Sequence, residues 1–391
     1  MSAILATFAE FRYLLKKNMK YFLKYSILLF VFLTACQKDN MVVLHGKDNR
    51  VIKQLTHRYQ NPNIAGLPKN KNMNKNTSLI SFNTTFIDTN LSDDFFSVFF
   101  INSKDGFISG RNGGIYKTTD SAKTWTKLNS TTTLPIRDLY FLDNSNGFAV
   151  GGESFCGGTG CTPPGGFILK TQDGGQSWTK IFTPSDKYVE ISSIYFIDKK
   201  IGFCVGSNVI FKTNDGGKTW KENKIDIFRG LMSKISFLDH QNGFIIGTFN
   251  KILKTNNGGL TWEISNPNKD FSYHSFSSSE GVSYVSGQGR IIKSVNGGSS
   301  WTELVNSPSD IFAIKFTDKN IGYAFGRGNY SGGCFGYSYG SMYSTNNGGA
   351  TWNGNGNFKE VGLIQSVSFP VPNIGYAISI SGNKIIKISI K

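Results

Sequence analysis

The sequence lacks the long apolar runs and the helical periodicity that would indicate a membrane-spanning or helical protein. Its prominent apolar run, YSILLFVFLTAC (25–36), is shorter than the roughly 20 residues that a bilayer-spanning helix requires. Beyond the N-terminus, no long segment repeats its apolar residues with the 3.6-residue period of an amphipathic helix. With 44 glycines and 32 phenylalanines, the composition instead favours many short strands joined by turns.

Histidine and cysteine are scarce, with four and five residues in 391. The histidines are scattered and form no ligand cluster of the kind that holds a metal ion: His45, His57, His240 and His274. No glycine-rich loop follows a strand and opens a helix, as a phosphate-binding loop would. We therefore expect no metal, no cofactor and no nucleic-acid partner.

The N-terminal segment has the pattern of a targeting signal. Basic residues precede the apolar run, in the order typical of an export signal: Lys16, Lys17, Lys20 and Lys24. LTAC (33–36) resembles a bacterial lipobox, which implies a signal peptide over 1–35 and a lipid on Cys36. The alternative is an ordinary secretory signal with a chance cysteine. Met19 would give a more usual signal length and is a possible true start.

Residues 36–78 are predicted to form a lipidated, basic tether, and 79–391 the folded domain. The segment 37–78 holds eight basic and two acidic residues, so it could lie against an anionic membrane. We favour a merely solvated linker. The start CQKDN (36–40) lacks an aspartate directly after the cysteine, and its resemblance to known lipoprotein sorting patterns favours the bacterial outer membrane. Either side of that membrane, periplasmic or surface, fits the sequence.

The remaining cysteines divide by context. Cys156 and Cys161 lie in a glycine-rich loop and are predicted to form a local disulfide in an oxidising compartment; metal binding is the alternative. Cys204, in GFCVG, alternates as a buried strand residue and is expected to be inert core. Cys334 has no evident partner.

Two phrases recur through the chain and define its repeat. The first occurs six times: KTTDSAKTW (117–125), KTQDGGQSW (170–178), KTNDGGKTW (212–220), KTNNGGLTW (254–262), KSVNGGSSW (293–301) and STNNGGATW (344–352). The second, of the form F-x-D-x-x-x-GF-x-x-G, occurs seven times with degenerate copies, and its turn glycines are 38 to 55 residues apart: Gly106, Gly147, Gly202, Gly243, Gly281, Gly322 and Gly375.

Each unit contains four strands; in unit 3 they are expected at 191–197, 202–206, 209–213 and 219–223. Four antiparallel strands in each of seven units predict an all-β fold, a single seven-bladed β-propeller. The last unit ends without a fourth strand. The β-rich segment LISFNTTFID (79–88) can supply it, so an N-terminal strand is expected to complete the last blade and close the ring.

The first phrase is predicted to build a turn rather than an active site. Its acidic or amide side chain can accept hydrogen bonds from nearby backbone N–H groups: Asp120, Asp173, Asp215, Asn257, Asn296 and Asn347. A glycine follows, replaced by Ala122 in unit 1, and then a tryptophan that buries its ring: Trp125, Trp178, Trp220, Trp262, Trp301 and Trp352. Because half of the copies carry asparagine, these carboxylates are not expected to be catalytic.

This phrase resembles the Asp-box (BNR) repeat. Together with the GF-x-x-G strand, it makes residues 94–391 similar to the photosystem II stability/assembly-factor-like family of exported seven-bladed propellers. The resemblance implies a non-catalytic binding or assembly scaffold. It does not carry over a photosynthetic partner. Asp-boxes also occur in sialidases and xyloglucan-active hydrolases.

One face of the propeller is expected to bind. In a four-stranded blade, the loops between strands 2 and 3 share one face with the connections between blades. The two insertions (152–166 and 327–341) and all five propeller arginines map there: Arg111, Arg137, Arg229, Arg290 and Arg327. Arginine suits recognition of carboxylate or phosphate, although exposed loops also favour solvated charge. The insertion at 327–341 adds contact aromatics or, alternatively, plugs the central channel: Tyr330, Phe335, Tyr337 and Tyr339.

The sequence therefore predicts an envelope-anchored, non-catalytic scaffold that presents a basic, aromatic face to a protein or an anionic glycan. The alternative is a sialidase-like or other glycan-cleaving hydrolase. Several carboxylates map near the same face and could form a catalytic pair, but no tyrosine–glutamate pair is evident, and the arginine–isoleucine–proline motif of sialidases is missing.

Overall fold

The computed structural model describes residues 82–391, apart from 154, 158–159, 163–164, 226–229, 249–250, 266–271, 288, 328–338, 359–360 and 381–383. For 155–157, 160–162 and 357 it describes the backbone alone. Every regular element in the described part is a β-strand. No helix long and apolar enough to cross a bilayer is found among these residues. The predicted signal peptide and tether, with Cys36, lie outside the described residues.

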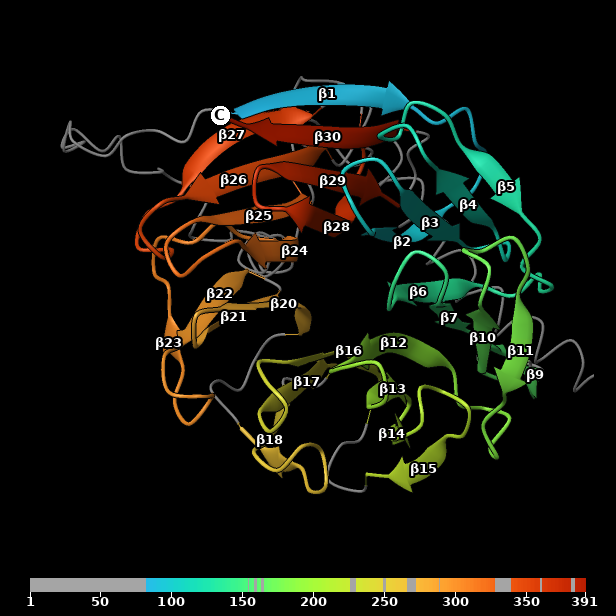
Figure 1. Ribbon diagram of the computed structural model, residues 1–391. Coiled ribbons are helices and arrows are strands. Elements are labelled where there is room, and N and C mark those ends of the chain that lie inside the picture. Colours follow the sequence, from blue (N-terminus) through green and yellow to red (C-terminus); the bar gives the residue numbers. More distant parts are fainter. Residues whose placement is uncertain are drawn as a thin grey trace, which may run out of the picture. The chain divides into compact units, whose positions relative to one another are not determined.

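Seven four-stranded antiparallel sheets, here called blades, form a ring (Figure 1). The strands of each blade are given from the innermost outward. Blade 1 consists of β2 (Phe95–Phe100), β3 (Gly106–Gly110), β4 (Ile115–Thr118) and β5 (Thr126–Leu128), and blade 2 of β6 (Ile136–Phe141), β7 (Gly147–Gly151), β10 (Phe167–Thr171) and β11 (Thr179–Phe182). Blade 3 consists of β12 (Ile191–Phe196), β13 (Gly202–Gly206), β14 (Val209–Thr213) and β15 (Lys221–Lys224), and blade 4 of β16 (Met232–Phe237), β17 (Gly243–Gly247), β18 (Ile252–Thr255) and β19 (Glu263–Ile264). Blade 5 consists of β20 (Tyr273–Ser279), β21 (Val282–Gly287), β22 (Arg290–Ser294) and β23 (Thr302–Glu303), and blade 6 of β24 (Ile311–Phe316), β25 (Gly322–Arg327), β26 (Gly340–Thr345) and β27 (Asn353–Phe358). Blade 7 consists of β28 (Ile364–Val371), β29 (Ile374–Ser379), β30 (Lys384–Ile390) and β1 (Phe82–Asp88). The innermost strand of each blade contacts those of both neighbouring blades, and β2 contacts β28, so the ring is closed.

The predicted closure by the N-terminal segment is confirmed. Strand β1 pairs antiparallel with β30, from Phe82 opposite Ile390 to Asp88 opposite Lys384. Blade 7 therefore takes three strands from the C-terminal end of the chain and its outermost strand from the start of the described residues. This pairing covers the outer edge of β30 and gives blade 7 the same four strands as the other blades.

The second strand of each blade is buried on both faces because it lies between two neighbouring blades. In β7, all five residues of GFAVG are buried. The strand begins with glycine because an aromatic ring occupies the space of its side chain: a Cβ on Gly147 would overlap the ring of Phe141.

A stack of two aromatic rings joins each blade to the next. The ring from strand 2 of one blade lies on a ring from the innermost strand of the following blade, with centroids 3.4 to 5.2 Å apart: Phe107–Phe141, Phe148–Phe196, Phe203–Phe237, Phe244–Phe276, Tyr284–Phe316, Tyr323–Phe369 and Tyr376–Phe100. Six of these pairs are stacked, and the Phe244–Phe276 pair is tilted by 31°. The tryptophan of each Asp-box phrase contacts such a stack edge-on, at centroid distances of 5.7 to 6.2 Å. Such offset and edge-to-face contacts add about 0.5–1.5 kcal/mol per pair beyond the buried area.

The Asp-box turns show why aspartate and asparagine alternate. Asp120 accepts hydrogen bonds from the backbone N–H and the hydroxyl of Thr124, at 2.9 and 2.6 Å. These bonds lower the pKa of Asp120 to about 2. In blade 4, Asn257 accepts from the backbone N–H of Thr261 and donates its amide to the Thr261 hydroxyl at 2.7 Å. The threonine hydroxyl donates to aspartate in blade 1 and accepts from asparagine in blade 4, so either residue can form the turn.

The turn also shifts one predicted boundary. In blade 3, Thr219 donates its backbone N–H to Asp215 and remains in the turn. The outermost strand therefore begins at Lys221 rather than at 219. In blade 1, Ala122 takes the left-handed conformation that glycine takes in the other turns, with φ of 70°.

A lysine in strand 3 joins this turn to the neighbouring blade. Its ammonium group donates to the first glycine carbonyl of the next blade's turn, at 2.9 to 3.1 Å: Lys117 to Gly174, Lys170 to Gly216, Lys212 to Gly258 and Lys293 to Gly348. The same ammonium groups lie 5.2 to 5.5 Å from the centroids of the strand 2 rings, within range of a cation–π interaction. Lys254 differs, because it pairs instead with Glu263 of its own blade.

Replacing Lys212 by methionine should lower the free energy of unfolding by about 1–3 kcal/mol, because one charge-assisted hydrogen bond and one cation–π contact between blades are lost. Lys254→Met is the matched control and should cost less than about 1 kcal/mol, since it removes only an ion pair within a blade. Chemical denaturation of both variants measures the difference. Equal losses would contradict the proposed clamp between blades.

Candidate functional site

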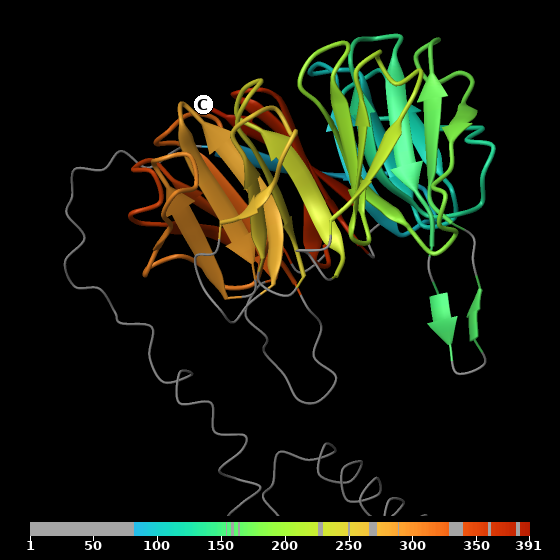
Figure 2. The same ribbon diagram turned by 90° about the horizontal axis from the view of Figure 1, so that it is seen from below.

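The face of the ring that carries the loops between strands 2 and 3 is here called the loop face. The β8 (Phe155–Gly157) and β9 (Gly160–Thr162) hairpin extends from this face of blade 2 (Figure 2). It belongs to the first predicted insertion, and its register places Cys156 opposite Cys161. The predicted disulfide between them stays a prediction, because the structure describes only the backbone of these two residues.

Two of the predicted arginines meet on one aromatic ring of the loop face. Arg111 follows the end of β3, and Arg137 is the second residue of β6. Their guanidinium carbons lie 5.6 and 4.6 Å from the centroid of the Phe96 ring. Each also has a carboxylate partner: Arg111 pairs with Asp94 at 2.9 Å and Arg137 with Glu190 at 3.8 Å. These ion pairs compensate much of the positive charge that the sequence pattern predicts here.

The other predicted residues lie apart from this pair. Arg290 opens β22 and pairs with Glu303 on the outermost strand of blade 5. Arg327 ends β25 and is exposed, and its side chain has no ion pair or hydrogen bond with any described residue. Tyr339, just before β26, is half-buried. The remaining candidates lie outside the described residues: Arg229, Tyr330, Cys334, Phe335 and Tyr337.

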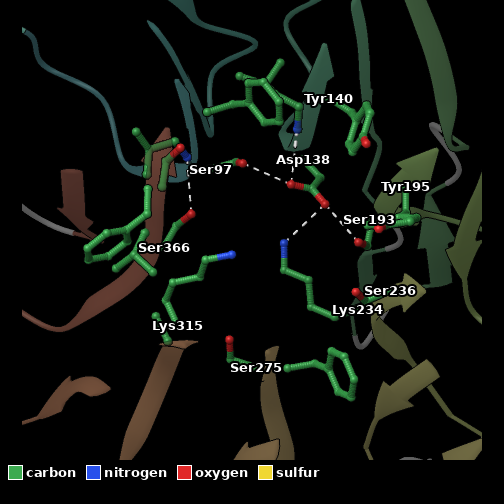
Figure 3. Close-up of a pocket in the computed structure, with 18 of the residues that line it drawn as sticks. Ser97, Asp138, Tyr140, Ser193, Tyr195, Lys234, Ser236, Ser275, Lys315 and Ser366 are labelled. Carbon is green, nitrogen blue, oxygen red and sulfur yellow. Dashed lines mark hydrogen bonds and ion pairs between the residues drawn. The ribbon is translucent and has the colours of Figure 1, made fainter. Parts of the chain in front are cut away.

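A cavity of about 440 Å³ occupies the centre of the ring and is lined by the innermost strands (Figure 3). Polar side chains recur there at the third and fifth positions of these strands. Several bond to the free backbone edge of the next blade's innermost strand: Ser366 to Val98 N, Ser275 to Ile314 N, Ser368 to Phe100 N, Ser277 to Phe316 N, Tyr140 to Phe196 O and Tyr195 to Phe237 O. These contacts satisfy edge groups that have no strand partner.

Asp138 takes a serine's place at the third position of β6 and is the hub of a network. Its carboxylate accepts hydrogen bonds from Ser97 Oγ (3.0 Å), Ser193 Oγ (2.8 Å), Leu139 N (3.2 Å) and Ile194 N (3.3 Å), and pairs with Lys234 Nζ at 3.2 Å. The residue is 6% exposed. With four hydrogen bonds and an ion pair, the acceptor sites of this carboxylate are occupied by groups of the protein itself.

Lys315 is the third charged residue of the cavity. It occupies the fifth position of β24, and Figure 3 shows its side chain directed into the cavity, as that of Lys234 is. It is half-buried, and burial lowers the pKa of its ammonium group. Among the described residues it has no hydrogen bond or ion pair. The lining thus carries two lysines and one carboxylate.

Two observations concern metal binding and nucleophilic chemistry in the described residues. Within the described part of the chain, no group of three or more histidine, cysteine, aspartate or glutamate side chains could hold a metal ion. Cys204 is fully buried, and burial and Asp138 raise the pKa of its thiol well above its usual value, so it is not an activated nucleophile. The site can offer positive charge and hydroxyl groups to an anion.

Four residues of the site are not among the residues predicted from the sequence: Asp138, Lys234, Lys315 and Phe96. A signal was present: aligning the seven innermost strands shows serine at the third position of blades 1, 3, 5 and 7. Against that background, the charged residues are exceptions. Their role became evident only once the ring placed them around one cavity.

Replacing Asp138 by serine should lower the free energy of unfolding by about 2–3 kcal/mol, because Lys234 and several donors lose their acceptor. The double variant Asp138→Ser, Lys234→Ser restores the residue that four other blades carry at this position. Its loss should be about 1 kcal/mol smaller than that of the single variant. Denaturant titration distinguishes these results, and additive losses would contradict the network.

The sequence matches the family described as photosynthesis system II assembly factor YCF48 over residues 183–263 and 228–384. Together these segments span 183–384, or 202 of 391 residues (384 − 183 + 1). No curated protein matches the sequence.

Several solved structures share the fold. A structure described as YCF48 bound to D1 peptide is 18% identical, with a TM-score of 0.61, and the match covers 79% of this chain and 97% of that one. YCF48 from Cyanidioschyzon merolae is 17% identical, with a TM-score of 0.59 and coverage of 78% and 98%. The GH74 enzyme of Niastella koreensis is 20% identical with a TM-score of 0.58, and the match covers 77% of this chain and 53% of the enzyme. At such identities the likeness establishes the propeller fold alone.

Proposed function

We propose that this chain, which belongs to the family of the photosynthesis system II assembly factor YCF48, is a non-catalytic scaffold that binds a polypeptide partner on its loop face. Two observations on relatives support the choice of partner. The family is described as an assembly factor, and one similar propeller is bound to a peptide. The match covers nearly the whole length of that relative's chain.

The observation that carries the proposal is the exposed arginine character of the loop face. Arg327 is exposed with no described partner for its side chain. The Arg111 side chain is 52% exposed, and a surface ion pair such as Arg111–Asp94 contributes only about 0–1 kcal/mol. A carboxylate of a partner can therefore replace Asp94 at little cost. Phe96 beneath the guanidinium adds an apolar surface for the same partner.

A glycan-cleaving hydrolase is the second candidate, because the GH74 enzyme shares the fold. This chain spans about half of that enzyme's length. Two carboxylates at the described loop face and channel are engaged: Glu190 faces Arg137, and Asp138 accepts four hydrogen bonds and an ion pair. This arrangement leaves neither of them poised as a general acid or nucleophile.

In a binding assay with immobilised peptides, the full chain should retain glutamate-rich peptides over their glutamine-rich counterparts. The variant Arg111→Ala, Arg327→Ala should bind at least about fivefold more weakly, because two charge-assisted contacts are lost. The matched control is Lys123→Ala, Lys218→Ala, which removes the same charge from exposed lysines in turns of the opposite face.

Equal weakening in both double variants would refute the loop-face assignment, since it would mean that net charge alone governs retention. Turnover of a polysaccharide panel by the full chain, lost on replacing a single loop-face carboxylate, would establish the hydrolase instead.

We further propose that a lipid on Cys36 anchors the scaffold to the bacterial outer membrane. The order of basic segment, apolar run and LTAC at the N-terminus supports this anchor. Expressed in a bacterium fed an alkyne-bearing fatty acid, the full chain should become labelled and fractionate with outer membranes. Cys36→Ser should remove the label and release the protein from membranes, whereas Cys334→Ser should retain both. Labelling that survives Cys36→Ser would exclude this anchor.

A further inference from the structure

The central channel has an unbalanced positive charge. Of the described residues that line it, Asp138 is the only acidic side chain, while Lys234 and Lys315 are both basic. The single carboxylate already pairs with Lys234. Lys315 is left without a hydrogen bond or ion pair among the residues that the structure describes. An ammonium group withdrawn from bulk water needs a counter-charge or hydrogen-bond acceptors.

Among the described lining residues, Lys315 has no carboxylate of its own as a counter-charge. The serine hydroxyls at the third and fifth positions mostly bond to Asp138 or to backbone N–H groups of the next blade. Ser236, two residues after Lys234 on β16, is the exception, because its hydroxyl has no partner within the described residues. Figure 3 shows Lys234, Lys315 and Ser236 around the same cavity. Three groups able to donate therefore face one space.

We propose that the channel binds a single carboxylate group, held between Lys315 and Lys234 with Ser236 as a further donor. The cavity of about 440 Å³ is large enough for a small organic acid or one acidic side chain. The net excess of one positive charge matches a monoanion rather than a phosphate dianion. Lysine ammonium groups act as point charges and do not require the planar, bidentate geometry of arginine. Burial, which lowers the pKa of Lys315, also strengthens its attraction for an anion.

This site differs from the loop-face arginines and does not depend on them. Lys234 and Lys315 lie at the third and fifth positions of six-residue innermost strands, whereas Arg111 and Arg327 lie at strand ends on the loop face. The carboxylate can come from a free organic acid or from an acidic side chain of a bound polypeptide. The two sources share one chemistry and are separated by the test.

Saturation-transfer NMR on the full chain in uncharged detergent provides the test, with acetate as the probe and acetamide as its uncharged counterpart. Acetate should bind saturably in the millimolar range, and acetamide should not. Lys315→Met should weaken acetate binding about tenfold or more, because the unpaired donor is lost. Lys315→Arg should retain most of the affinity. Lys319→Met, which removes the same charge from an exposed lysine of blade 6, should leave it unchanged.

Absence of saturable acetate binding, or equal binding by the Lys315→Met variant with native circular dichroism, would overturn the proposal. If Lys315→Met does not fold, Lys315→Gln replaces it with the same expectation. A short peptide with one glutamate then identifies the source. Competition with acetate, absent for the glutamine peptide, assigns the channel to an acidic side chain; failure to compete assigns it to a free acid. The loop-face proposal is judged separately, by the response of peptide binding to Arg111 and Arg327.

Discussion

The aromatic stack between neighbouring blades is the interaction on which the rest of this structure depends. In each of the seven junctions, a ring from strand 2 lies on a ring from the next innermost strand. The glycine that begins strand 2, the tryptophan that ends the Asp-box phrase and the lysine of strand 3 all serve this contact. Such a stack needs a partner blade on each side, so no single repeat can bury its own rings. Closure of the ring is the condition for its stability.

The junction between blades 6 and 7 shows what happens where the pattern is interrupted. Blade 7 has no Asp-box turn, because its outermost strand is β1. Correspondingly, the strand 3 lysine is replaced by Ser344 in blade 6, and the buried hydroxyl of Tyr323 has no hydrogen-bond partner among the described atoms. Phe86 of β1 contacts Phe358 of β27 edge-on, at 5.3 Å between centroids. The lysine is therefore missing where it would have no glycine carbonyl to bind.

Function in this propeller is best sought in departures from the repeat. The repeated residues are engaged in turns and junctions, so they cannot vary without loss of stability. At the third position of the innermost strands, four serines alternate with Asp138, Lys234 and an alanine. At the fifth position, Lys315 is the one charged residue. A rigid ring presents such departures around a common axis at no further conformational cost, which is the preorganisation that binding sites need.

The sequence by itself determined the architecture, because each of its seven units carries the same local signals: turn residues, strand alternation and a fixed order of phrases. It also determined the closure, since six Asp-box phrases and seven glycine–aromatic phrases leave one strand missing. It did not reveal the carboxylate partners of the loop-face arginines. Ion pairs such as Arg111–Asp94 and Arg290–Glu303 join residues 17 and 13 positions apart. Only the tertiary structure decided the channel, where Asp138, Lys234 and Lys315 come from three blades. Their proximity arises from ring closure, which brings together residues that no local pattern relates.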